Sequence, residues 1–257
     1  MENMPDIYDM FPIYGEDDLF KDVNRHILPE DSMLEGIPGD YIMRTRYFSV
    51  GASAISVIRQ VLQAQDRHIS DVKRVLDYAC GFGRVHRWLR VAFPRAVVRG
   101  VDADAPSVAG AKQLGFDAET LDLALNDDLG KFDLIWIGSL FTHLSYEESA
   151  RTLKFLRRQL SPSGALIITT HGTDVVERIN AGAPYGLETD GLKSLFETFK
   201  RTGWGYADYP DHDGYGISLS SPDVTMKLLS DCDMIPFFFR AKGWDKHQDV
   251  YACTPLD

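Results

Sequence analysis

The sequence predicts an α/β protein of the doubly wound class, in which helices cover both faces of a mostly parallel sheet. From residue 74 onward, short apolar runs rich in β-branched residues alternate with amphipathic helical stretches, the pattern of repeated strand and helix units. The first of these runs leads through a glycine-containing loop directly into a helix, as at the ligand-binding edge of such sheets. The chain has 257 residues, enough for a large core.

Strands and helices alternate regularly in the first half of this pattern. Ahead of it, Ile55, Ile58, Val61 and Leu62 recur at helical spacing and predict a helix within residues 41–70 that packs before the first strand. The next five elements are expected at Arg74–Ala79 (strand), Arg84–Phe93 (helix), Val97–Val101 (strand), Pro106–Leu114 (helix) and Ala118–Leu121 (strand).

The helix expected at Arg84–Phe93 has two distinct faces. Three arginines, Arg84, Arg87 and Arg90, are expected on its solvent side. Four apolar residues share the other face and are expected to contact the sheet: Val85, Trp88, Leu89 and Ala92.

The second half begins with the apolar run Phe132–Ser139, which is typical of a central strand buried on both faces. A helix at Tyr146–Leu160, a turn at residues 161–164 and a strand at Ala165–Thr170 follow. The alternation then breaks at residues 173–221, which indicate an insertion with a helix at Leu192–Arg201 and an aromatic, glycine-rich stretch. The last elements are expected at Pro222–Asp231 (helix), Met234–Arg240 (strand) and Asp249–Thr254 (strand).

The charge of the chain is concentrated near its N-terminus. The formal net charge is −11, of which residues 1–40 carry −9 because eleven acidic residues there face only Lys21 and Arg25. Acids of this arm, such as Asp6 and Asp9, alternate with aromatic and aliphatic residues, so we expect the arm to dock on the rest of the protein. An acidic balance argues against a general binder of nucleic acid or anionic membranes.

The cysteines and the N-terminal residues indicate a cytoplasmic protein. Cys80, Cys232 and Cys253 are odd in number and widely spaced, without a CxxC pair or a zinc-type spacing, so reduced thiols and no metal site are expected. The first residues lack a basic start followed by an apolar run. No stretch approaches the roughly 18 apolar residues that a membrane span needs, so we expect no membrane span.

The loop after the first strand, residues 77–84 (DYACGFGR), is the first candidate ligand site. Gly81 and Gly83 permit a tight turn and the close approach of a ligand. Asp102 follows nineteen residues after Gly83, at the end of the second strand. A carboxylate at that position can accept hydrogen bonds from both hydroxyls of an adenosine ribose.

Two kinds of nucleotide site compete for this loop. A nicotinamide site uses G-x-G-x-x-G, and this chain has His86 where the third glycine belongs. In S-adenosylmethionine sites, an acid instead lies four residues before the first glycine that the ligand approaches closely. Asp77 has this position relative to Gly81. A doubly wound domain with an unrelated or empty site is the remaining alternative.

At these motifs the sequence resembles the class I S-adenosylmethionine-dependent methyltransferases. VLDYACGFGR is similar to the first motif of that family, VRGVDAD to its second strand with the ribose acid, FDLIWIGSLFTHL to its fourth strand, and LSPSGALIITT to its fifth. The resemblance covers roughly residues 72–172, with a weaker match at 222–254. It implies a Rossmann-like, mostly parallel sheet of seven strands, with the insertion as an α+β lid.

The resemblance also implies a division of the chain into two domains. Residues 1–70 would form an acidic arm with cap helices, and residues 71–257 the cofactor-binding methyltransferase domain with a substrate lid at about 173–221. One departure from the family is Ala79, which replaces the first glycine of D-x-G-x-G-x-G. Its methyl group is small enough to be tolerated but narrows the methionine pocket.

The implied cofactor is S-adenosyl-L-methionine. The resemblance assigns the methionine moiety to the first loop, the ribose to Asp102, the adenine to Ala103 and its edge to Asp122 or Leu123, with Asp127 and Asp128 as rivals. The residues of the first loop that are implied are Asp77, Ala79, Cys80, Gly81 and Gly83.

The backbone of Ile137, Gly138 and Ser139 would meet the amino group of the cofactor. Arg46, or its neighbour Arg44, is a candidate partner for the cofactor carboxylate. A purely structural role for these two arginines is equally open.

Methyl transfer to a hydroxyl benefits from a general base, usually a histidine. His143 and His171 directly follow the fourth and fifth strands and are the catalytic candidates, with His212 in the insertion as a third. The stretch LFTHL resembles a form of the fourth-strand motif in which the histidine is catalytic, caps the next helix or contacts the cofactor.

The insertion supplies the candidate substrate residues. Tyr206, Tyr209, His212 and Tyr215, together with Trp204, offer flat surfaces and hydroxyls suited to a sugar or a small aromatic molecule. The alternative is that these aromatic residues only pack the lid. The C-terminal stretch GWDKHQDV resembles a tail found in bacterial methyltransferases that are encoded near glycosyltransferases.

The resulting hypothesis is an O-methyltransferase, monomeric or homodimeric, whose substrate is a small molecule or glycan; the acidic arm favours a neutral or cationic acceptor. A cofactor-binding sensor or partner subunit without catalytic activity is the second hypothesis. An RNA methyltransferase is the third, and it would depend on five arginines near the first helix: Arg84, Arg87, Arg90, Arg95 and Arg99.

Overall fold

The computed structural model describes residues 15–34, 41–210 and 212–256. The chain divides into two compact units, Met1–Leu123 and Ala124–Asp257. The boundary between them lies between the third and fourth strands, inside the segment predicted as the methyltransferase domain, whereas the boundary near residue 70 remains a prediction.

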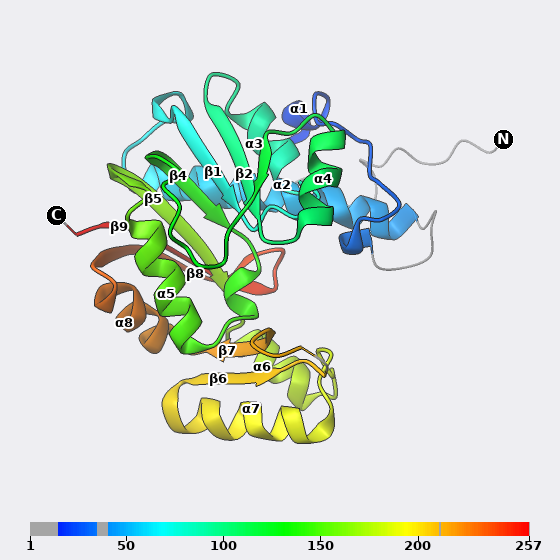
Figure 1. The fold of residues 1–257 in the computed structure, drawn as a ribbon, viewed down its shortest axis with the longest axis vertical. Coiled ribbons are helices and arrows are strands. Elements are labelled where there is room, and N and C mark those ends of the chain that lie inside the picture. The colour runs from blue at the N-terminus through cyan, green and yellow to red at the C-terminus, as the bar shows by residue number, and fades with distance from the viewer. Residues whose placement is uncertain (1–14, 35–40, 211, 257) are drawn as a thin grey trace. The chain divides into compact units, whose positions relative to one another are not determined.

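The first unit contains three parallel strands in the order β3-β2-β1. Residues Arg74 to Tyr78 of β1 pair in register with Val97 to Val101 of β2, and all of β1 except Arg74 is buried. The elements of this unit are α1 (Asp17–Phe20), the short 3-10 helices η2 (Ser32–Leu34) and η3 (Ile69–Asp71), α2 (Tyr41–Ala64), β1 (Arg74–Tyr78), α3 (His86–Ala92), β2 (Val97–Asp102), α4 (Ala105–Gln113) and β3 (Ala118–Thr120) (Figure 1).

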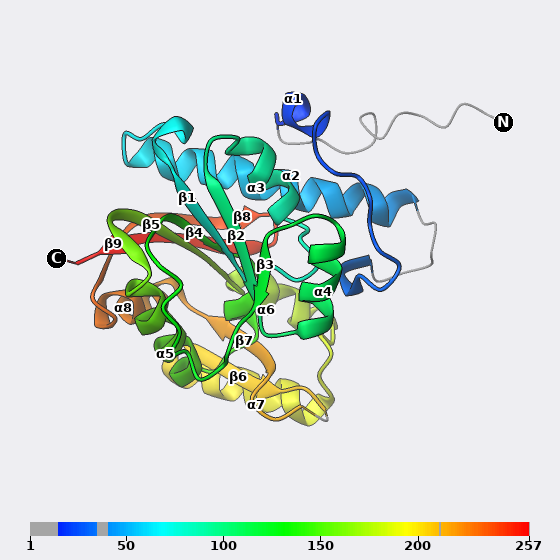
Figure 2. The ribbon, with the colours of Figure 1, turned by 45° about the horizontal axis from the view of Figure 1, so that its top comes forward.

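The second unit continues the pattern and ends in a long antiparallel hairpin, drawn in red in Figure 1. Its parallel pair is β4 with β5, and β9 runs antiparallel between β5 and β8. Helices α5 and α8 lie side by side (Figures 1 and 2). The elements are β4 (Phe132–Ile137), η4 (Leu140–Thr142), α5 (Tyr146–Arg157), β5 (Leu160–Thr170), α6 (Thr173–Asn180), α7 (Thr189–Thr202), β6 (Trp204–Asp208), β7 (Gly216–Ser220), α8 (Pro222–Asp231), β8 (Met234–Trp244) and β9 (Gln248–Pro255).

The predicted fold class is confirmed. The large sheet has seven strands in the order β3-β2-β1-β4-β5-β9-β8, and it is mostly parallel. The prediction of a turn at residues 161–164 is wrong, because these residues belong to strand β5. The register jumps from Phe132 opposite Leu160 to Leu134 opposite Ala165, so the additional residues form a bulge in a continuous strand.

The insertion folds around a small core of its own. Helix α7 packs on the two-stranded antiparallel sheet β6-β7 (Figure 1). Helix α6, which the sequence analysis did not anticipate, contributes to the same apolar cluster. The buried members of this cluster are Val175, Ile179, Leu187, Leu195, Ile217 and Leu219.

The N-terminal segment docks where the structure describes it, at residues 15–34. Phe20 is fully buried and stacks on Trp88 of α3 at 5.6 Å between ring centroids. The buried carboxylate of Glu16 accepts two hydrogen bonds from Arg59 of α2, at 2.8 and 3.0 Å. The docking prediction is therefore confirmed for this part, while Asp6 and Asp9 lie outside the described residues.

The prediction that Arg84, Arg87 and Arg90 face solvent is wrong for Arg87. The apolar face is buried as expected, with Trp88 and Leu89 fully inaccessible. Arg87, however, is only 1% exposed, whereas Arg90 is exposed. The reason is that the N-terminal segment covers this side of the helix, a contact that helical periodicity alone does not reveal.

Candidate active site

The first candidate site is the loop between β1 and α3, which contains three residues with left-handed backbone. Ala79, Gly81 and Gly83 have φ values of 59°, 53° and 84°. For Ala79 this conformation costs about 1 kcal/mol, because its Cβ approaches the following carbonyl. Only glycine fits at position 83, since a Cβ there would lie 2.6 Å from the ring of Phe116. No other atom lies within 4 Å of a Cβ built on Gly81, so space is open beside the middle of the loop.

Asp102, at the end of β2, is joined to this loop. One carboxylate oxygen accepts a hydrogen bond from the amide of Gly81 at 2.7 Å, and the other accepts one from the amide of Asp104 at 2.9 Å. Burial raises the pKa of Asp102, although the two amide donors oppose that shift. The side chain remains partly exposed, and Ala103 beside it is exposed. The structure thus brings together the predicted ribose acid and the predicted methionine loop.

Asp77 lies deeper than the other candidates. Its carboxylate is 2% exposed, and one oxygen lies 3.6 Å from Nδ1 of the equally buried His86. Burial raises the pKa of Asp77, and His86 opposes the shift. Oδ2 of Asp77 and both ring nitrogens of His86 have no hydrogen-bond partner in the described structure. The histidine at the position of the third glycine therefore lies beneath the loop and faces the acid.

The remaining candidates of the first unit are at its surface, except for Cys80. Arg46 and Arg44 lie on α2 with exposed side chains. Asp122 and Leu123 follow β3, and Leu123 is 63% exposed. Cys80 is buried, its amide donates to the carbonyl of Val101 at 3.1 Å, and burial raises the pKa of its thiol.

In the second unit, the turn after β4 is held by a closed hydrogen-bond network. Ser139 has a left-handed backbone, with φ of 68°. Its amide donates a hydrogen bond to Oγ1 of Thr169 at 2.8 Å, and the hydroxyl of Thr169 donates to Oε1 of Gln248 at 2.6 Å. Nε2 of Gln248 donates to Oγ of Ser139 at 2.7 Å, which closes the network. Thr142 also donates to the Ser139 carbonyl. This network fixes the turn at the carboxyl end of β4.

Ile137 and Gly138 lead into this turn. Ile137 is fully buried at the end of β4, so only its backbone is available for contacts. Gly138 lies against the indole of Trp244, and a Cβ built there would come within 2.7 Å of that ring. Trp244 also meets Trp136 edge to face at 5.4 Å. Glycine is required at position 138 by this close approach.

His143, just beyond the turn, is bound on one side of its ring. Nδ1 lies 2.8 Å from the carbonyl oxygen of Gly216 and 3.2 Å from the hydroxyl of Tyr209. Its ring stacks on Tyr215, with 4.9 Å between centroids and an interplanar angle of 24°. Burial lowers the pKa of His143, although the bond to Gly216 opposes the shift.

His171, after β5, is the more deeply buried of the two catalytic candidates. It is 4% exposed, and Nδ1 has no hydrogen-bond partner in the described structure. Burial, together with the neighbouring rings of His247 and His143, lowers the pKa of His171 to about 3. The rings of His171 and His143 meet edge to face with 6.5 Å between centroids.

The structure separates the candidate substrate residues into two groups. Tyr209 and Tyr215 lie against His143. Tyr206 instead donates its hydroxyl to Asp208 at 2.6 Å. His212 is exposed, and its amide donates to the carbonyl of Tyr209 at 3.1 Å. Trp204 is buried at the start of β6.

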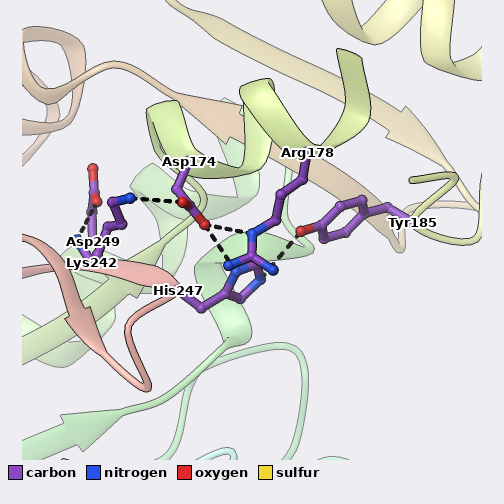
Figure 3. Close-up of polar contacts among 6 residues, drawn as sticks. All are labelled: Asp174, Arg178, Tyr185, Lys242, His247 and Asp249. Carbon is purple, nitrogen blue, oxygen red and sulfur yellow. Dashed lines mark hydrogen bonds and ion pairs between the residues drawn. The ribbon is translucent and has the colours of Figure 1, made fainter. Parts of the chain in front are cut away.

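Figure 3 shows a polar cluster that the sequence analysis did not identify. Asp174 of α6 forms ion pairs with Arg178 at 2.6 Å and with Lys242 at 2.9 Å, and His247 approaches it at 3.5 Å. Burial raises the pKa of Asp174, but the bonds from Lys242 and Arg178 outweigh it and lower the pKa to about 2. The spacing of Asp174 and Arg178 on one helix was the available signal.

Tyr185 completes this cluster. Its hydroxyl lies 3.4 Å from Nε2 of His247, and the two rings stack at 6.0 Å (Figure 3). The amide of Lys242 donates to Asp249 at 2.9 Å. The cluster therefore joins the tip of the β8–β9 hairpin to the first helix of the insertion.

In residues 15–34, 41–210 and 212–256, no group of three or more histidine, cysteine or acidic side chains is arranged to hold a metal ion. No helix in the same ranges is long and apolar enough to cross a membrane.

Comparison with known proteins agrees with this geometry. Residues 76–168 match the family model of a methyltransferase domain. No curated protein matches the sequence at a significant level.

Among solved structures, the chain is similar to an S-adenosylmethionine-dependent methyltransferase from Clostridium acetobutylicum, with a TM-score of 0.57, 13% identity, and coverage of 80% of this chain and 92% of that chain. It is also similar to the CcbJ methyltransferase from Streptomyces caelestis, with a TM-score of 0.54, 14% identity, and coverage of 80% and 90%. It is similar as well to human N-acetylserotonin methyltransferase in complex with S-adenosylmethionine, with a TM-score of 0.52, 15% identity, and coverage of 95% of this chain and 67% of that chain. At these identities the likeness establishes the fold.

The matched domain spans β1 to β5, which carry the glycine loop, Asp102 and the turn at Ser139. Together with the shared fold, it supports a class I S-adenosylmethionine-dependent methyltransferase with S-adenosylmethionine as the cofactor.

Proposed function

We propose that the protein methylates a hydroxyl of a small molecule or glycan, with His143 as the general base. The observation that carries this proposal is the fixed orientation of the imidazole. A carbonyl oxygen can only accept, so the 2.8 Å contact between Nδ1 and the Gly216 carbonyl assigns the proton to Nδ1. Nε2 is then the nitrogen whose lone pair can accept a proton.

The environment of His143 keeps the imidazole uncharged. Burial lowers the pKa of His143 below its ordinary value of 6.5, so the imidazole is neutral at physiological pH. A general base must be unprotonated at the working pH, and a pKa close to that pH makes it effective. His143 meets the first condition without a dedicated partner carboxylate.

His171 is less suited to the same task. With a pKa lowered to about 3, its ring is neutral but only weakly basic. Since its ring packs edge to face against His143, we propose that it positions His143 and does not itself take the proton.

The surface around His143 supports a substrate with a flat ring. Tyr215 is 43% exposed and stacks on His143, so an aromatic ring of the kind that packs against sugars and aromatic molecules lies at the surface beside the imidazole. Tyr209 places a hydroxyl near the same imidazole. Tyr206 and His212 remain candidates for contacts farther from the reacting hydroxyl.

The residues of the first unit fit the cofactor. The left-handed loop leaves open space at Gly81, and Asp102 is partly exposed beside it. Each oxygen of a carboxylate can accept more than one hydrogen bond, so Asp102 can bind ribose hydroxyls while it holds Gly81. We propose the methionine moiety at the loop of Ala79, Cys80, Gly81 and Gly83, and the adenine near Ala103, Asp122 and Leu123.

For the remaining cofactor groups the proposals follow the resemblance. The backbone of Ile137, Gly138 and Ser139 is proposed to contact the amino group, and Arg46 to pair with the carboxylate. Asp77 contributes by supporting the loop from below, as its burial against His86 indicates.

The bound cofactor supplies a methyl group on a positively charged sulfur. The enzyme has to hold the acceptor oxygen in line with that methyl group, and such alignment supplies much of the rate acceleration. In the proposed step Nε2 of His143 would take the proton of the acceptor hydroxyl while the bond between oxygen and the methyl carbon forms and the bond between that carbon and sulfur breaks, which leaves the sulfur as a neutral thioether. No protein residue is methylated in this step.

Two measurements test the proposal. S-adenosylhomocysteine should raise the melting temperature of the wild-type protein by mass action. Methyl transfer to a panel of hydroxylated small molecules and glycans should then be detected with wild type and be reduced about 100-fold or more in His143→Gln, while the melting shift persists. Binding without transfer to any acceptor would favour the sensor hypothesis, and no melting shift would contradict cofactor binding itself.

Three of the five arginines on which the nucleic-acid hypothesis depends are engaged within the protein. Arg87 is buried, Arg90 donates to the carbonyl of Gly115, and Arg99 pairs with Glu119.

The three cysteines are unpaired and buried, which fits the proposed cytoplasmic location.

A further inference from the structure

The buried arginine of α3 lies between the cofactor loop and the N-terminal segment. Nε of Arg87 donates to the carbonyl oxygen of Gly83 at 3.1 Å, and that oxygen also accepts the backbone amide of Arg87 at 3.2 Å. Nη1 donates to the carbonyls of Asn24 and His26 at 2.9 and 2.8 Å. Nη2 donates to the hydroxyl of Tyr47 at 3.1 Å.

This arrangement continues to a buried acid. The hydroxyl of Tyr47 donates to Oδ2 of Asp31 at 2.7 Å, and both side chains are at most 3% exposed. Oδ1 of Asp31 caps the turn at Met33, whose amide donates to it at 3.0 Å. A chain of hydrogen bonds thus runs from Asp31 through Tyr47 and Arg87 to the carbonyl of Gly83.

Aromatic rings enclose the guanidinium and exclude water. Its carbon lies 5.1 Å from the ring centroid of Tyr47, 5.6 Å from that of Phe116 and 5.8 Å from that of Phe48. Four of the five N–H groups that an arginine carries are accounted for by the bonds above. A buried cation is retained only where its donors are satisfied, so this site is specific for arginine.

The loop that Arg87 contacts needs external support. Three of its residues are in left-handed conformations, and one of them, Ala79, is not glycine. Strained backbone of this kind persists only where the surrounding structure determines it. Asp102 holds the loop at Gly81, and Arg87 holds it at Gly83.

We propose that Arg87 is a positioning residue for cofactor binding, and that through it residues 24–31 of the N-terminal segment keep the glycine loop in its binding conformation. The proposal rests on the assignment of this loop to the cofactor. Because the bonds from Arg87 go to the backbone carbonyls of Asn24 and His26, they depend on how the segment is placed and not on its side chains at those two positions.

The expected effect is on the population of the competent loop. When only a fraction of the molecules holds the binding conformation, the apparent affinity falls by that fraction. We expect Arg87→Gln to weaken S-adenosylhomocysteine binding about tenfold, which corresponds to about 1.4 kcal/mol. Arg87→Lys keeps the charge but lacks the fork of donors, so an intermediate loss is expected. Tyr47→Phe removes one hydrogen bond at a distance from the loop, so it should cause the smallest loss of S-adenosylhomocysteine affinity.

The experiment is isothermal titration of the full-length protein with S-adenosylhomocysteine, at a temperature at which every variant is folded. Hydrogen exchange of the amides of residues 79–83 is measured without ligand, and it should be faster in Arg87→Gln. The control is Ile58→Ala or Ile58→Val, whichever matches the loss of stability, because Ile58 is fully buried in α2 and no bond joins it to the loop. This control should bind with wild-type affinity.

Three outcomes would overturn the proposal. Arg87→Gln could bind as wild type does, or the Ile58 control could lose as much affinity, which would make the effect one of general stability. If Arg87→Gln does not fold, the proposal would be overturned by Arg87→Lys and Tyr47→Phe both binding S-adenosylhomocysteine with wild-type affinity. Failure of the wild-type protein to bind S-adenosylhomocysteine would be distinct, since it removes the cofactor assignment and this proposal with it.

Discussion

The amide of Gly81 donates a hydrogen bond of 2.7 Å to the carboxylate of Asp102, twenty-one residues later in the chain. This bond joins the loop after β1 to the end of β2 before any ligand arrives. Asp102 therefore supports the loop, and in the proposed function it also presents oxygen atoms to the ribose. A substitution at this position removes both.

Asp102→Ala is predicted to abolish the melting shift produced by S-adenosylhomocysteine, and Asp102→Asn to weaken binding at least tenfold. The physical reason is the loss of a charged acceptor, which contributes about 1.5–3 kcal/mol to a hydrogen bond. Thermal unfolding with and without ligand provides the measurement. Glu119→Gln, which removes an exposed acid of the same unit, is the control and should keep the wild-type shift. An undiminished shift in Asp102→Ala would contradict the ribose assignment.

His143→Gln is predicted to reduce methyl transfer by about 100-fold or more, the usual contribution of a general base. Glutamine can still donate to the carbonyl of Gly216 but cannot take a proton at neutral pH. The measurement is transfer of labelled methyl groups to the best acceptor of the panel, at saturating cofactor. His68→Gln serves as a control because His68 caps η3 in the first unit. Equal rates in wild type and His143→Gln would exclude base catalysis by this residue.

The pH dependence of the same reaction should have an acidic limb set by His143. Burial lowers the pKa of His143 below 6.5, so the base is unprotonated at pH 7 and becomes protonated only as the pH falls below that value. We therefore expect kcat/KM to be flat above pH 7 and to decline under more acidic conditions. The limb should disappear from the residual activity of His143→Gln. A limb that remains unchanged in that variant would assign it to another group.

Asp174→Asn is predicted to destabilise the protein by about 1 kcal/mol at pH 7, the upper range for partly exposed ion pairs. The pKa of Asp174 is lowered to about 2 from an ordinary value of 3.8, so its contribution is complete above the ordinary value and is lost as the pH falls toward 2. The difference between variant and wild type in urea unfolding should accordingly shrink below pH 4. Asp231→Asn, which breaks an exposed pair with Lys227, should change stability less. A pH-independent difference would show that the charge is not responsible.

Gly138→Ala is predicted to destabilise the protein by about 1–3 kcal/mol, the cost of overpacking. The added methyl group would lie 2.7 Å from the indole of Trp244. Urea unfolding measures the loss, and Trp244→Phe in the same chain should recover part of it by making room.

Gly191→Ala is the matched control for this substitution. A Cβ at Gly191 meets only ordinary contacts of 3.6 Å or more, and the residue lies within α7. Alanine should therefore raise stability by up to about 1 kcal/mol through helix propensity. Equal effects of the two substitutions would show that contact with Trp244 does not limit residue 138.

Much of the fold was predictable because its signals are local. Apolar runs and helical spacing placed the strands and helices, and α8 was predicted at its observed bounds, Pro222–Asp231. The chemistry of the first loop was equally local, since Gly81, Gly83 and the acid after β2 occur at a spacing that only a few sites use. The sequence also drew attention to His143, because it follows a strand that ends at the ligand-binding edge.

Tertiary structure alone decided how these residues are held. Arg87 occupies a helical position that resembles a solvent-facing one, yet it bonds to carbonyls 61 and 63 residues away. The tautomer of His143 depends on a carbonyl 73 residues later, and Asp174 meets Lys242 across 68 residues. Periodicity reports which face of an element is apolar, but it contains no information about which distant segment covers that face. For this protein, the sequence indicated the proposed cofactor loop and the catalytic candidates, and long-range packing decided which of these residues are supported and which are buried.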